Sequence, residues 1–365
     1  MIREVDLVGV SLRDVAHLAG VSVKTVSNVV NGYAHVSPLT RAKVEQALSE
    51  LDYRPNLSAR NLRQGRTGVI ALALPEIDKP YFSELSRFVI AAAAEQRWIV
   101  VIEQTDGDLR RERQVLDGVR DHRIDGLILS PVAIGEEELA ARTDDTALVL
   151  LGERIHDGPA DHVAIDNVRA ARDVTEHLIG LGRTRVAALG AQDNAASGTA
   201  PLRLAGYREA MAAHRLAETV VKVERYGRAE GAAAMSALLA SADPPDAVFC
   251  FNDLLALGAM RAILSSGAGV PEDIAVAGLD DIEDGRFSTP TLTTVAPDKA
   301  QLARIAVDLL KQRLDGSVHR PAREMRADYR LLIRESTVPP LRRAASLPGD
   351  RWTGGIGPRP DVSSR

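Results

Sequence analysis

The stretch LRDVAHLAGVSVKTVSNVVN, residues 12–31, has the pattern of two short helices joined by a tight turn. Ser11 and Asp14 have the spacing of a capping box, which marks the start of a helix. Gly20 ends that helix, because glycine tolerates the positive φ of a helix C-terminus. Ser22 then caps a second helix. This succession is the helix-turn-helix pattern of DNA-binding proteins, and an ordinary αα-hairpin is the alternative.

The second helix is expected to turn one face inward and the other outward. Helical spacing places three valines on the inner face: Val26, Val29 and Val30. The outer face carries Val23, Lys24, Ser27 and Asn28. In helix-turn-helix proteins the N-terminal residues of this helix contact base edges in the major groove. The outer face is therefore a candidate base-reading surface, and a solvated helix face is the alternative.

A third helix and a basic linker complete the N-terminal part of the chain. Ser37-Pro38 supplies a cap followed by proline at the first helical position, and the helical pattern ends before Tyr53. We therefore predict a three-helix head over residues 1–54. Residues 55–67 carry three arginines and suit a helix, but the segment is too short to be stable alone. It is predicted to be a linker that orders only on DNA, and a plain solvated linker is the alternative.

From Val69 to about Ile333, apolar runs alternate with amphipathic helices. The runs lie at residues 69–74, 99–102, 124–129, 147–151, 185–189, 246–251 and 274–279. Continuous apolar strands alternating with helices predict parallel sheets covered on both faces. The length exceeds one such sheet, so two lobes with a ligand cleft between them are expected over residues 68–335. Residues 336–365, rich in Gly, Pro and Arg toward the end, are predicted to be a disordered tail.

Charge and composition restrict the classes of protein that fit. The formal net charge is −5, yet residues 1–68 carry 9 Lys and Arg against 6 Asp and Glu, and the remainder carries 36 against 44. A small basic module on an acidic body steers its basic end toward phosphate. Cys250 is the only cysteine, which excludes internal disulfides and fits a reducing, cytoplasmic setting. The N-terminal residues are too charged for a signal peptide, and no apolar run approaches the roughly 20 residues of a membrane span. We therefore expect no membrane association.

The sequence lacks the common catalytic and metal-binding motifs. No GxxxxGK[ST], HExxH or GxSxG occurs. The eight histidines are scattered without the ligand spacing of a zinc site. We therefore expect no cofactor and no metal, and an α/β enzyme is the less favoured alternative.

The sequence as a whole resembles the lactose-repressor (LacI) family of bacterial transcription regulators. The resemblance spans residues 11–335 and rests on motifs in a fixed order: LRDVAHLAGVSVKTVSNVVN (12–31), HVSPLTRAKVEQALSELDYRPNLSARNLR (35–63), PYFSEL (80–85), DGLIL (125–129), RLAGYREAM (203–211), FNDLLALGAMRAI (251–263) and VAGLDDIEDGRFSTPTLTTV (276–295). It implies an α/β fold with a helix-turn-helix head, a hinge helix and a two-lobed core like periplasmic sugar-binding proteins. It also implies a homodimeric repressor of carbohydrate-metabolism genes that binds a pseudo-palindromic operator and responds to a small sugar.

Carried over position by position, the resemblance implies two sets of DNA contacts. Base readers would be Val23, Lys24 and Asn28, with Leu62 wedged into the minor groove. Phosphate contacts would be Ser22, Thr25, Ser27, Asn31 and His35. Many family members have arginine where this chain has Asn28, so the half-site sequence is left open.

The resemblance also implies effector contacts in the cleft: Tyr81, Phe82, Asp166, Arg203, Tyr226, Asn252 and Asp280, with Glu153 as a weaker candidate. Arg203 and Asp280 would grip sugar hydroxyls through charge-assisted hydrogen bonds, and Tyr226 would stack on the ring. The alternative roles are core packing for the aromatic residues and an interlobe salt bridge for Arg203 and Asp280. A nucleobase fits the same chemistry, so a nucleobase-responsive, co-repressed regulator is a second hypothesis. A sugar-binding protein that does not act on DNA is a third.

Overall fold

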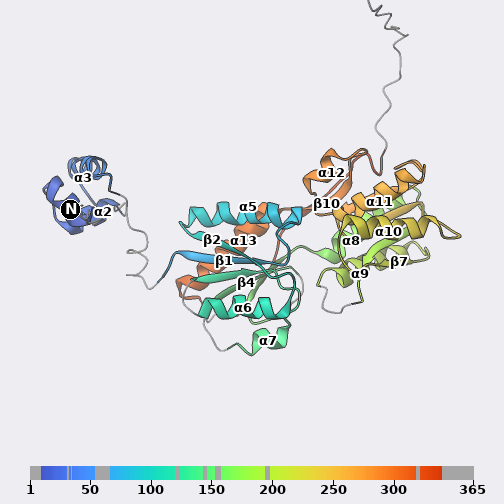
Figure 1. Cartoon of the computed structure of the whole chain (residues 1–365), viewed down its shortest axis with the longest axis horizontal. Helices are drawn as coiled ribbons and strands as arrows, with labels where there is room; N and C mark the ends of the chain where they lie inside the picture. Colours follow the sequence, from blue (N-terminus) through green and yellow to red (C-terminus); the bar gives the residue numbers. More distant parts are fainter. Residues whose placement is uncertain are drawn as a thin grey trace, which may run out of the picture.

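The computed structural model describes residues 10–30, 33, 35–53, 66–120, 124–142, 146–152, 158–193, 198–317 and 321–338. The predicted hinge helix up to residue 65 and the tail beyond residue 338 lie outside this description, as do Asn31, Leu62 and Glu153. The described elements form a small helical head followed by a core of two α/β lobes (Figure 1).

The described residues of the head form three short helices: α1 (Leu12–Ala19), α2 (Val23–Val30) and α3 (Pro38–Glu50). The predicted capping box is confirmed, because the Asp14 carboxylate accepts a 2.8 Å hydrogen bond from the Ser11 backbone N–H. Gly20 has φ 65°, which closes α1 as predicted. Each helix turns an apolar stripe to one small core, whose buried members are Val15, Ala16, Val26, Val29, Val44 and Ala47.

Each lobe of the core is built on a sheet of six described strands. In the N lobe the order is β11 (Glu324–Arg326), β5 (Asp161–Ala164), β4 (Ala147–Leu151), β3 (Gly126–Leu129), β1 (Val69–Leu74) and β2 (Ile99–Gln104). In the C lobe it is β12 (Tyr329–Leu332), β10 (Thr293–Pro297), β9 (Ala275–Leu279), β8 (Ala247–Cys250), β6 (Val186–Ala191) and β7 (Thr219–Lys222). The described strand pairs are parallel, apart from the antiparallel pair of β10 and β12. The prediction of two parallel-sheet lobes is confirmed.

Helices cover both faces of each sheet (Figure 1). The N-lobe helices are α5 (Pro80–Glu95), α6 (Leu109–Arg120), α7 (Glu136–Ala140) and α13 (Lys299–Gln312), and α13 continues into the turn η1 (Arg313–Ser317). The C-lobe helices are α8 (Asn167–Gly180), α9 (Ala200–Ala213), α10 (Arg228–Leu239), α11 (Asp253–Ser265) and the short α12 (Glu283–Phe287). No helix within the described ranges combines the length and apolar character needed to cross a membrane.

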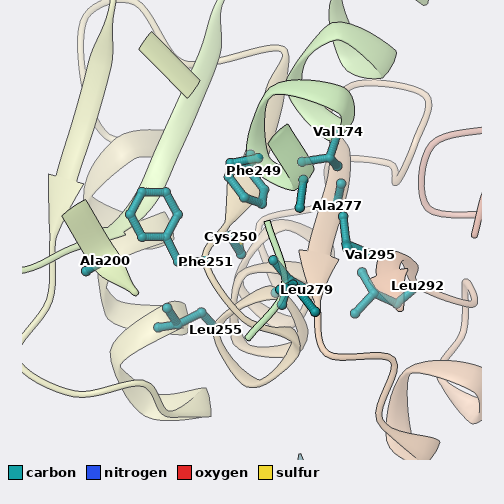
Figure 2. Close-up of a cluster of buried hydrophobic side chains, with 14 of the residues drawn as sticks. Val174, Ala200, Phe249, Cys250, Phe251, Leu255, Ala277, Leu279, Leu292 and Val295 are labelled. Carbon is teal, nitrogen blue, oxygen red and sulfur yellow. The ribbon is translucent and has the colours of Figure 1, made fainter. Parts of the chain in front are cut away.

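The C-lobe core packs tightly around β8, as Figure 2 shows. Phe249 and Phe251 meet with ring centroids 5.3 Å apart, and Cys250 is fully buried between them in the chain. Burial raises the pKa of the Cys250 thiol, so the thiol stays protonated and unreactive. Helices α10 and α11 approach each other so closely that a Cβ on Gly258 would lie 2.0 Å from the Arg228 carbonyl oxygen.

The seven predicted apolar runs became β1, β2, β3, β4, β6, β8 and β9. The runs predicted from residues 124 and 246 begin as strands one or two residues later, because Asp125 and Asp246 have another role. The Asp125 carboxylate accepts from the backbone N–H groups of Thr67 and Gly68, at 2.6 and 2.7 Å. Asp246 does the same for the segment that precedes β6. Each aspartate therefore joins its strand to the chain entering the neighbouring strand.

Among the described elements, the chain crosses between the lobes three times. The crossings lie between β5 and α8, between β10 and α13, and between β11 and β12. Helix α13, which follows the C-lobe strand β10, packs on α5 and on the N-lobe strands β3, β4 and β5. The N lobe is therefore assembled from segments that lie before and after the C lobe in sequence.

The core extends past both of its predicted boundaries. Residue 67, assigned to the linker, is bonded to Asp125 at the start of the N lobe. Ser336 and Thr337, assigned to the tail, are buried in the C lobe. The Ser336 hydroxyl donates to the Val276 carbonyl at 2.6 Å and accepts from the Thr293 N–H at 2.8 Å. These polar side chains are held by partners distant in sequence, which composition alone does not indicate.

Candidate functional site

The outer face of α2 presents the predicted base-reading side chains to different extents. Val23 is 42% exposed and Lys24 is exposed, whereas Ser27 and Asn28 are half-buried. Ser22 caps α2, since its hydroxyl accepts from the Thr25 N–H at 3.1 Å and lies 2.9 Å from the Thr25 hydroxyl. The rim thus consists of an exposed cation and apolar side chain beside a capped helix end, an arrangement that suits a DNA groove and its phosphates.

His35, the remaining described phosphate candidate, is exposed after α2. A backbone carbonyl in this connection, that of Tyr33, accepts a 2.8 Å hydrogen bond from the Arg41 guanidinium on α3. The connection is therefore tied to the third helix near the end of α2.

A cavity of about 200 Å³ lies between the two lobes. Its walls come from the carboxyl ends of β4, β5, β9 and β10, from the segments that follow β1, β3 and β8, and from residues of α5, α8, α9, α11 and α13. Parallel α/β sheets bind ligands at the carboxyl ends of their strands, and here two such edges face one space. Six of the seven predicted contacts line it: Tyr81, Phe82, Arg203, Tyr226, Asn252 and Asp280.

The N-lobe wall of the cavity is largely apolar. Tyr81 and Phe82 stand edge to face on the first turn of α5, with ring centroids 5.3 Å apart, and Leu85 follows them. The charged residues on this side are Glu76 and Lys79, which pair at 3.7 Å. This wall therefore offers flat surfaces and a balanced charge to a ligand.

Arg203 is the main fixed cation of the C-lobe wall. Its side chain is almost completely buried, and its Nε donates to Asn167 Oδ1 at 2.8 Å. A second guanidinium nitrogen, Nη1, donates to the Phe251 carbonyl. Because Asn167 at the start of α8 and the loop after β8 hold it from two sides, the guanidinium is fixed before any ligand arrives.

Asp280 lies beside this cation with its backbone at φ 128°. Non-glycine residues rarely adopt positive φ, and such strain is concentrated at functional sites. Burial raises the pKa of Asp280, and the Glu84 carboxylate raises it further, against the attraction of Arg203 and Lys299. Burial and the neighbouring Asp280 likewise raise the pKa of Asp253. The Asp280 side chain lines the cavity, and in its ionised form it can accept hydrogen bonds from a ligand.

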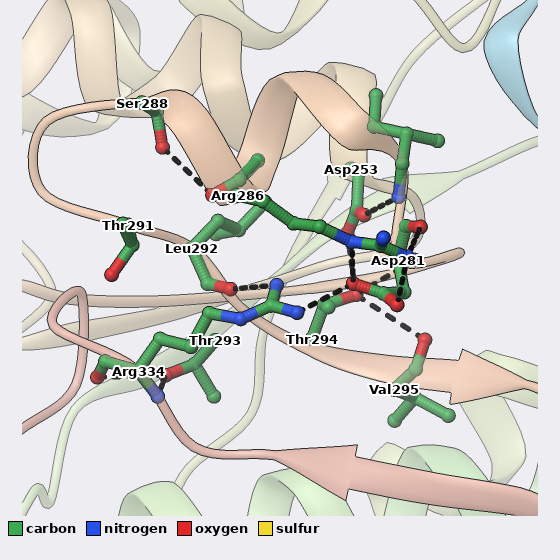
Figure 3. Close-up of polar contacts among 12 residues, drawn as sticks. Asp253, Asp281, Arg286, Ser288, Thr291, Leu292, Thr293, Thr294, Val295 and Arg334 are labelled. Carbon is green, nitrogen blue, oxygen red and sulfur yellow. Dashed lines mark hydrogen bonds and ion pairs between the residues drawn. The ribbon is translucent and has the colours of Figure 1, made fainter.

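Asp281 and Asp253 hold the strained segment in place (Figure 3). The Asp281 carboxylate accepts from Arg286 at 2.6 Å and from Arg334 at 2.7 Å. Burial raises the pKa of Asp281, but the bonds to the two arginines outweigh burial and lower it. Asp253, the first residue of α11, accepts from the Ile282 N–H at 3.0 Å and from the Thr294 hydroxyl at 2.6 Å. These contacts fix the backbone that presents Asp280.

Asn252 and Tyr226 complete the polar wall. The Asn252 side-chain oxygen caps α11 by accepting from the Leu255 N–H at 2.9 Å, which leaves its NH₂ group to face the cavity. The Tyr226 hydroxyl donates to the Gly190 carbonyl at 3.0 Å, and burial raises the pKa of this phenol. The hydroxyl is therefore occupied, and the half-buried ring is the part of Tyr226 available to a ligand.

Asp166 is placed differently from the expectation, since it caps α8 instead of lining the cavity. Its carboxylate accepts from the Arg169 N–H at 3.0 Å and from Arg326 at 3.2 Å. The next residue, Asn167, lines the cavity and holds Arg203. Sequence reasoning also missed Ser130 and Thr199. Both are single hydroxyl residues outside any motif, so no sequence signal identifies them.

The cavity suits a small, polar and uncharged ligand. Arg203, Asp280 and Asn252 together supply donors and acceptors on one side, and aromatic faces lie opposite. The described part of the chain contains no group of three or more His, Cys, Asp or Glu side chains that could hold a metal ion.

Comparison with known families matches both parts of the chain. Residues 11–56 match the bacterial regulatory proteins of the lacI family, and residues 175–337 match a periplasmic binding protein-like domain. The ribose operon repressor of Escherichia coli K12 is 35% identical over 309 residues, covering 83% of this chain and 93% of that repressor. The transcriptional repressor PurR of Vibrio campbellii is 32% identical over 313 residues, covering 85% and 93%.

A solved structure of the lac repressor dimer, bound to operator and the anti-inducer ONPF, has the same architecture. It aligns with a TM-score of 0.74 and 30% identity, covering 90% of this chain and 99% of that one. At this coverage the alignment includes residues outside the two lobes.

Proposed function

This chain belongs to the LacI family of bacterial regulatory proteins, and we propose that it is a transcriptional repressor whose affinity for its operator is changed by a small sugar bound between its lobes. The observation that carries the proposal is the cavity itself. A fixed guanidinium, a carboxylate and an amide face aromatic rings across about 200 Å³. Hydroxyl groups of a sugar satisfy such a set, and the apolar face of its ring suits the aromatic side chains.

The chain divides into parts with separate roles. We assign DNA binding to the head, residues 1–54, with the following segment to residue 65 as the hinge. We assign effector binding and dimerisation to the core from residue 66 to residue 337. Lys24, Val23 and Asn28 are the proposed base readers of α2, and Leu62 is the proposed minor-groove wedge. Ser22, Thr25, Ser27, Asn31 and His35 are the proposed phosphate contacts.

Two copies of the chain would bind the two halves of a pseudo-palindromic operator. Closure of the lobes on a sugar moves the start of the N lobe, where Arg66 and Thr67 join the hinge to the core. The separation of the two hinges then changes, and with it the population able to bind DNA. Effector and operator must change each other's affinity by the same factor. We expect the effector to lower operator affinity.

Binding to DNA from upstream of its own gene tests the regulatory function directly. Fluorescence anisotropy with this fragment should give specific binding that Lys24→Ala weakens about ten-fold, because a good base contact contributes about 1–3 kcal/mol. Lys43→Ala is the matched control, since Lys43 is an exposed lysine on α3 outside the proposed face. Equal loss in both variants would contradict the assignment of α2 as the reader.

Calorimetric titration identifies the class of effector. The panel contains D-ribose, D-glucose, D-galactose, cellobiose, guanine and hypoxanthine, each titrated into the full chain with and without the DNA fragment. Binding of a sugar that also changes operator affinity supports the proposal. Binding of a purine alone would favour the nucleobase-responsive alternative, which the repressor PurR among the relatives keeps open. We assign no catalytic step to the cavity.

A further inference from the structure

Lys299 is a buried cation at a crossing between the lobes. It is the first residue of α13, directly after the segment by which the chain returns from the C lobe. Its side chain is only 5% exposed, which is rare for lysine and requires partners. An ordinary exposed lysine at a helix start would have neither this burial nor this requirement.

The partners of Lys299 lie in both lobes. Its Nζ pairs with Glu84 Oε2 on α5 of the N lobe at 2.5 Å. The same Nζ donates to the backbone carbonyl of Asp281 in the C lobe at 3.2 Å. Since α5 and α13 pack together in the N lobe, the bond to Asp281 is the one that joins the lobes.

Lys299 also lies next to the effector cavity. Its Nζ is 5.6 Å from the ring centroid of Tyr81, on the N-lobe wall. The backbone carbonyl that accepts from Lys299 belongs to Asp281, the residue after Asp280. The positive charge of Lys299 also attracts the Asp280 carboxylate. Moving this ammonium group would therefore change its contact with Tyr81, its attraction to Asp280 and its bond across the lobes at the same time.

We propose that Lys299 is an interlobe positioning residue, whose buried ammonium group holds the Asp281 carbonyl of the C lobe against α5 of the N lobe and so favours the closed cavity. The inference rests on the proposed function, because closure matters only if the cavity is the effector site. Lys299 is not among the residues that line the cavity, so its role is to position the lobes. It sets the equilibrium between open and closed lobes, and Glu84 keeps its charge compensated at the junction.

The test measures lobe separation in the full chain without sugar or DNA. Two exposed residues, Arg110 on α6 of the N lobe and Ala237 on α10 of the C lobe, are replaced as Arg110→Cys and Ala237→Cys and labelled with a donor and acceptor dye. Cys250 is buried and does not compete for the dyes. Labelled chain is diluted into unlabelled chain so that single-molecule energy transfer reports distances within one protomer.

Lys299→Met is expected to raise the ratio of open to closed molecules about ten-fold, because the closed state loses a buried, charge-assisted contact. Glu84→Gln keeps the bond to Asp281 and should open the lobes less. Lys299→Arg should restore part of the closed population. Lys222→Met is the matched control, because Lys222 pairs with Asp193 inside the C lobe and should leave the distribution unchanged.

An unchanged distribution in Lys299→Met, with the fold retained by circular dichroism, would overturn the proposal. If that variant does not fold, Glu84→Gln decides, and a distribution identical to wild type overturns the proposal in the same way. The measurement uses neither operator nor effector, so its failure is distinct from a failure of the proposed function, which the DNA and sugar titrations report.

Discussion

Replacing Asp280 with asparagine should stabilise the free protein and weaken sugar binding at once. Burial raises the pKa of the Asp280 carboxylate, and the attraction of Arg203 and Lys299 does not offset this effect. The neighbouring Asp253 and Glu84 carboxylates add repulsion. An ionised carboxylate held this way costs about 1.4 kcal/mol for each unit of raised pKa. Asparagine has nearly the same shape without the charge, so we expect Asp280→Asn to gain about 1–3 kcal/mol in the free energy of unfolding at pH 8.

The gain should depend on pH in one direction. A pKa raised in the folded state means that the wild type is favoured while Asp280 is protonated, and loses stability as the pH rises through the folded pKa. The difference between Asp280→Asn and wild type should therefore be small near pH 4 and largest at pH 8. Urea unfolding at both values measures it. Asp284→Asn, which changes an exposed carboxylate paired with Arg228, should show no such gain.

Sugar binding should move the other way. A hydrogen bond from a sugar hydroxyl to a charged acceptor contributes about 1.5–3 kcal/mol, so Asp280→Asn should weaken binding about ten-fold or more. Calorimetric titration with the sugar found in the panel measures this loss. A variant less stable than wild type at pH 8, or one with unchanged sugar affinity, would refute the role assigned to Asp280.

Three further outcomes test the core and the head. Asp161→Asn should lower the free energy of unfolding by about 3–5 kcal/mol, because it leaves Arg313 and Arg323 without their carboxylate. In the wild type, burial raises the pKa of Asp161 but the arginines lower it to about 2, so about 2 kcal/mol of stability should be lost as the pH falls from 4 toward 2 in urea titrations. Gly258→Ala should destabilise by about 1–3 kcal/mol or more, since its Cβ meets backbone, whereas Gly118→Ala in open space on α6 should stabilise by about 0.5–1 kcal/mol in the same assay. Log operator affinity should fall steeply with log salt, by about 0.9 per neutralised phosphate, and a flat response would contradict phosphate-led binding.

The sequence predicts the elements whose signals are local. The capping box at Ser11 and the turn at Gly20 involve neighbours within four residues, and the long apolar strands need no partner to be recognised. The strand β5 escapes prediction because it begins with Asp161 and His162, which read as loop residues. Its burial depends on Arg313 and Arg323, more than 150 residues away in the chain. The short edge strands β7, β11 and β12 escape because none of them has more than two apolar residues in a row, whereas the edge strand β2 has the apolar run of residues 99–102.

The cavity could be predicted only as far as the family motifs extend. Arg203, Asn252 and Asp280 lie within such motifs and line the cavity as expected. Asp166 was the predicted contact, but it caps α8, and its neighbour Asn167 lines the cavity instead. A helix cap and a ligand contact use the same polar residue types, so the sequence does not distinguish them. Lys299 gave no signal at all, since a lysine at the start of an amphipathic helix is ordinary until its burial is known.

The three crossings between the lobes also determine the order in which the chain can fold during synthesis. Residues 167–297 contain the C lobe apart from β12 and the residues that follow it, so most of that lobe leaves the ribosome as one continuous unit. The N lobe begins earlier but lacks α13 and its edge strand β11 until residue 326 has emerged. The face of the N-lobe sheet that α13 covers is therefore exposed to solvent while the C lobe is synthesised. Truncating the gene after the C lobe would leave this apolar face exposed in the product.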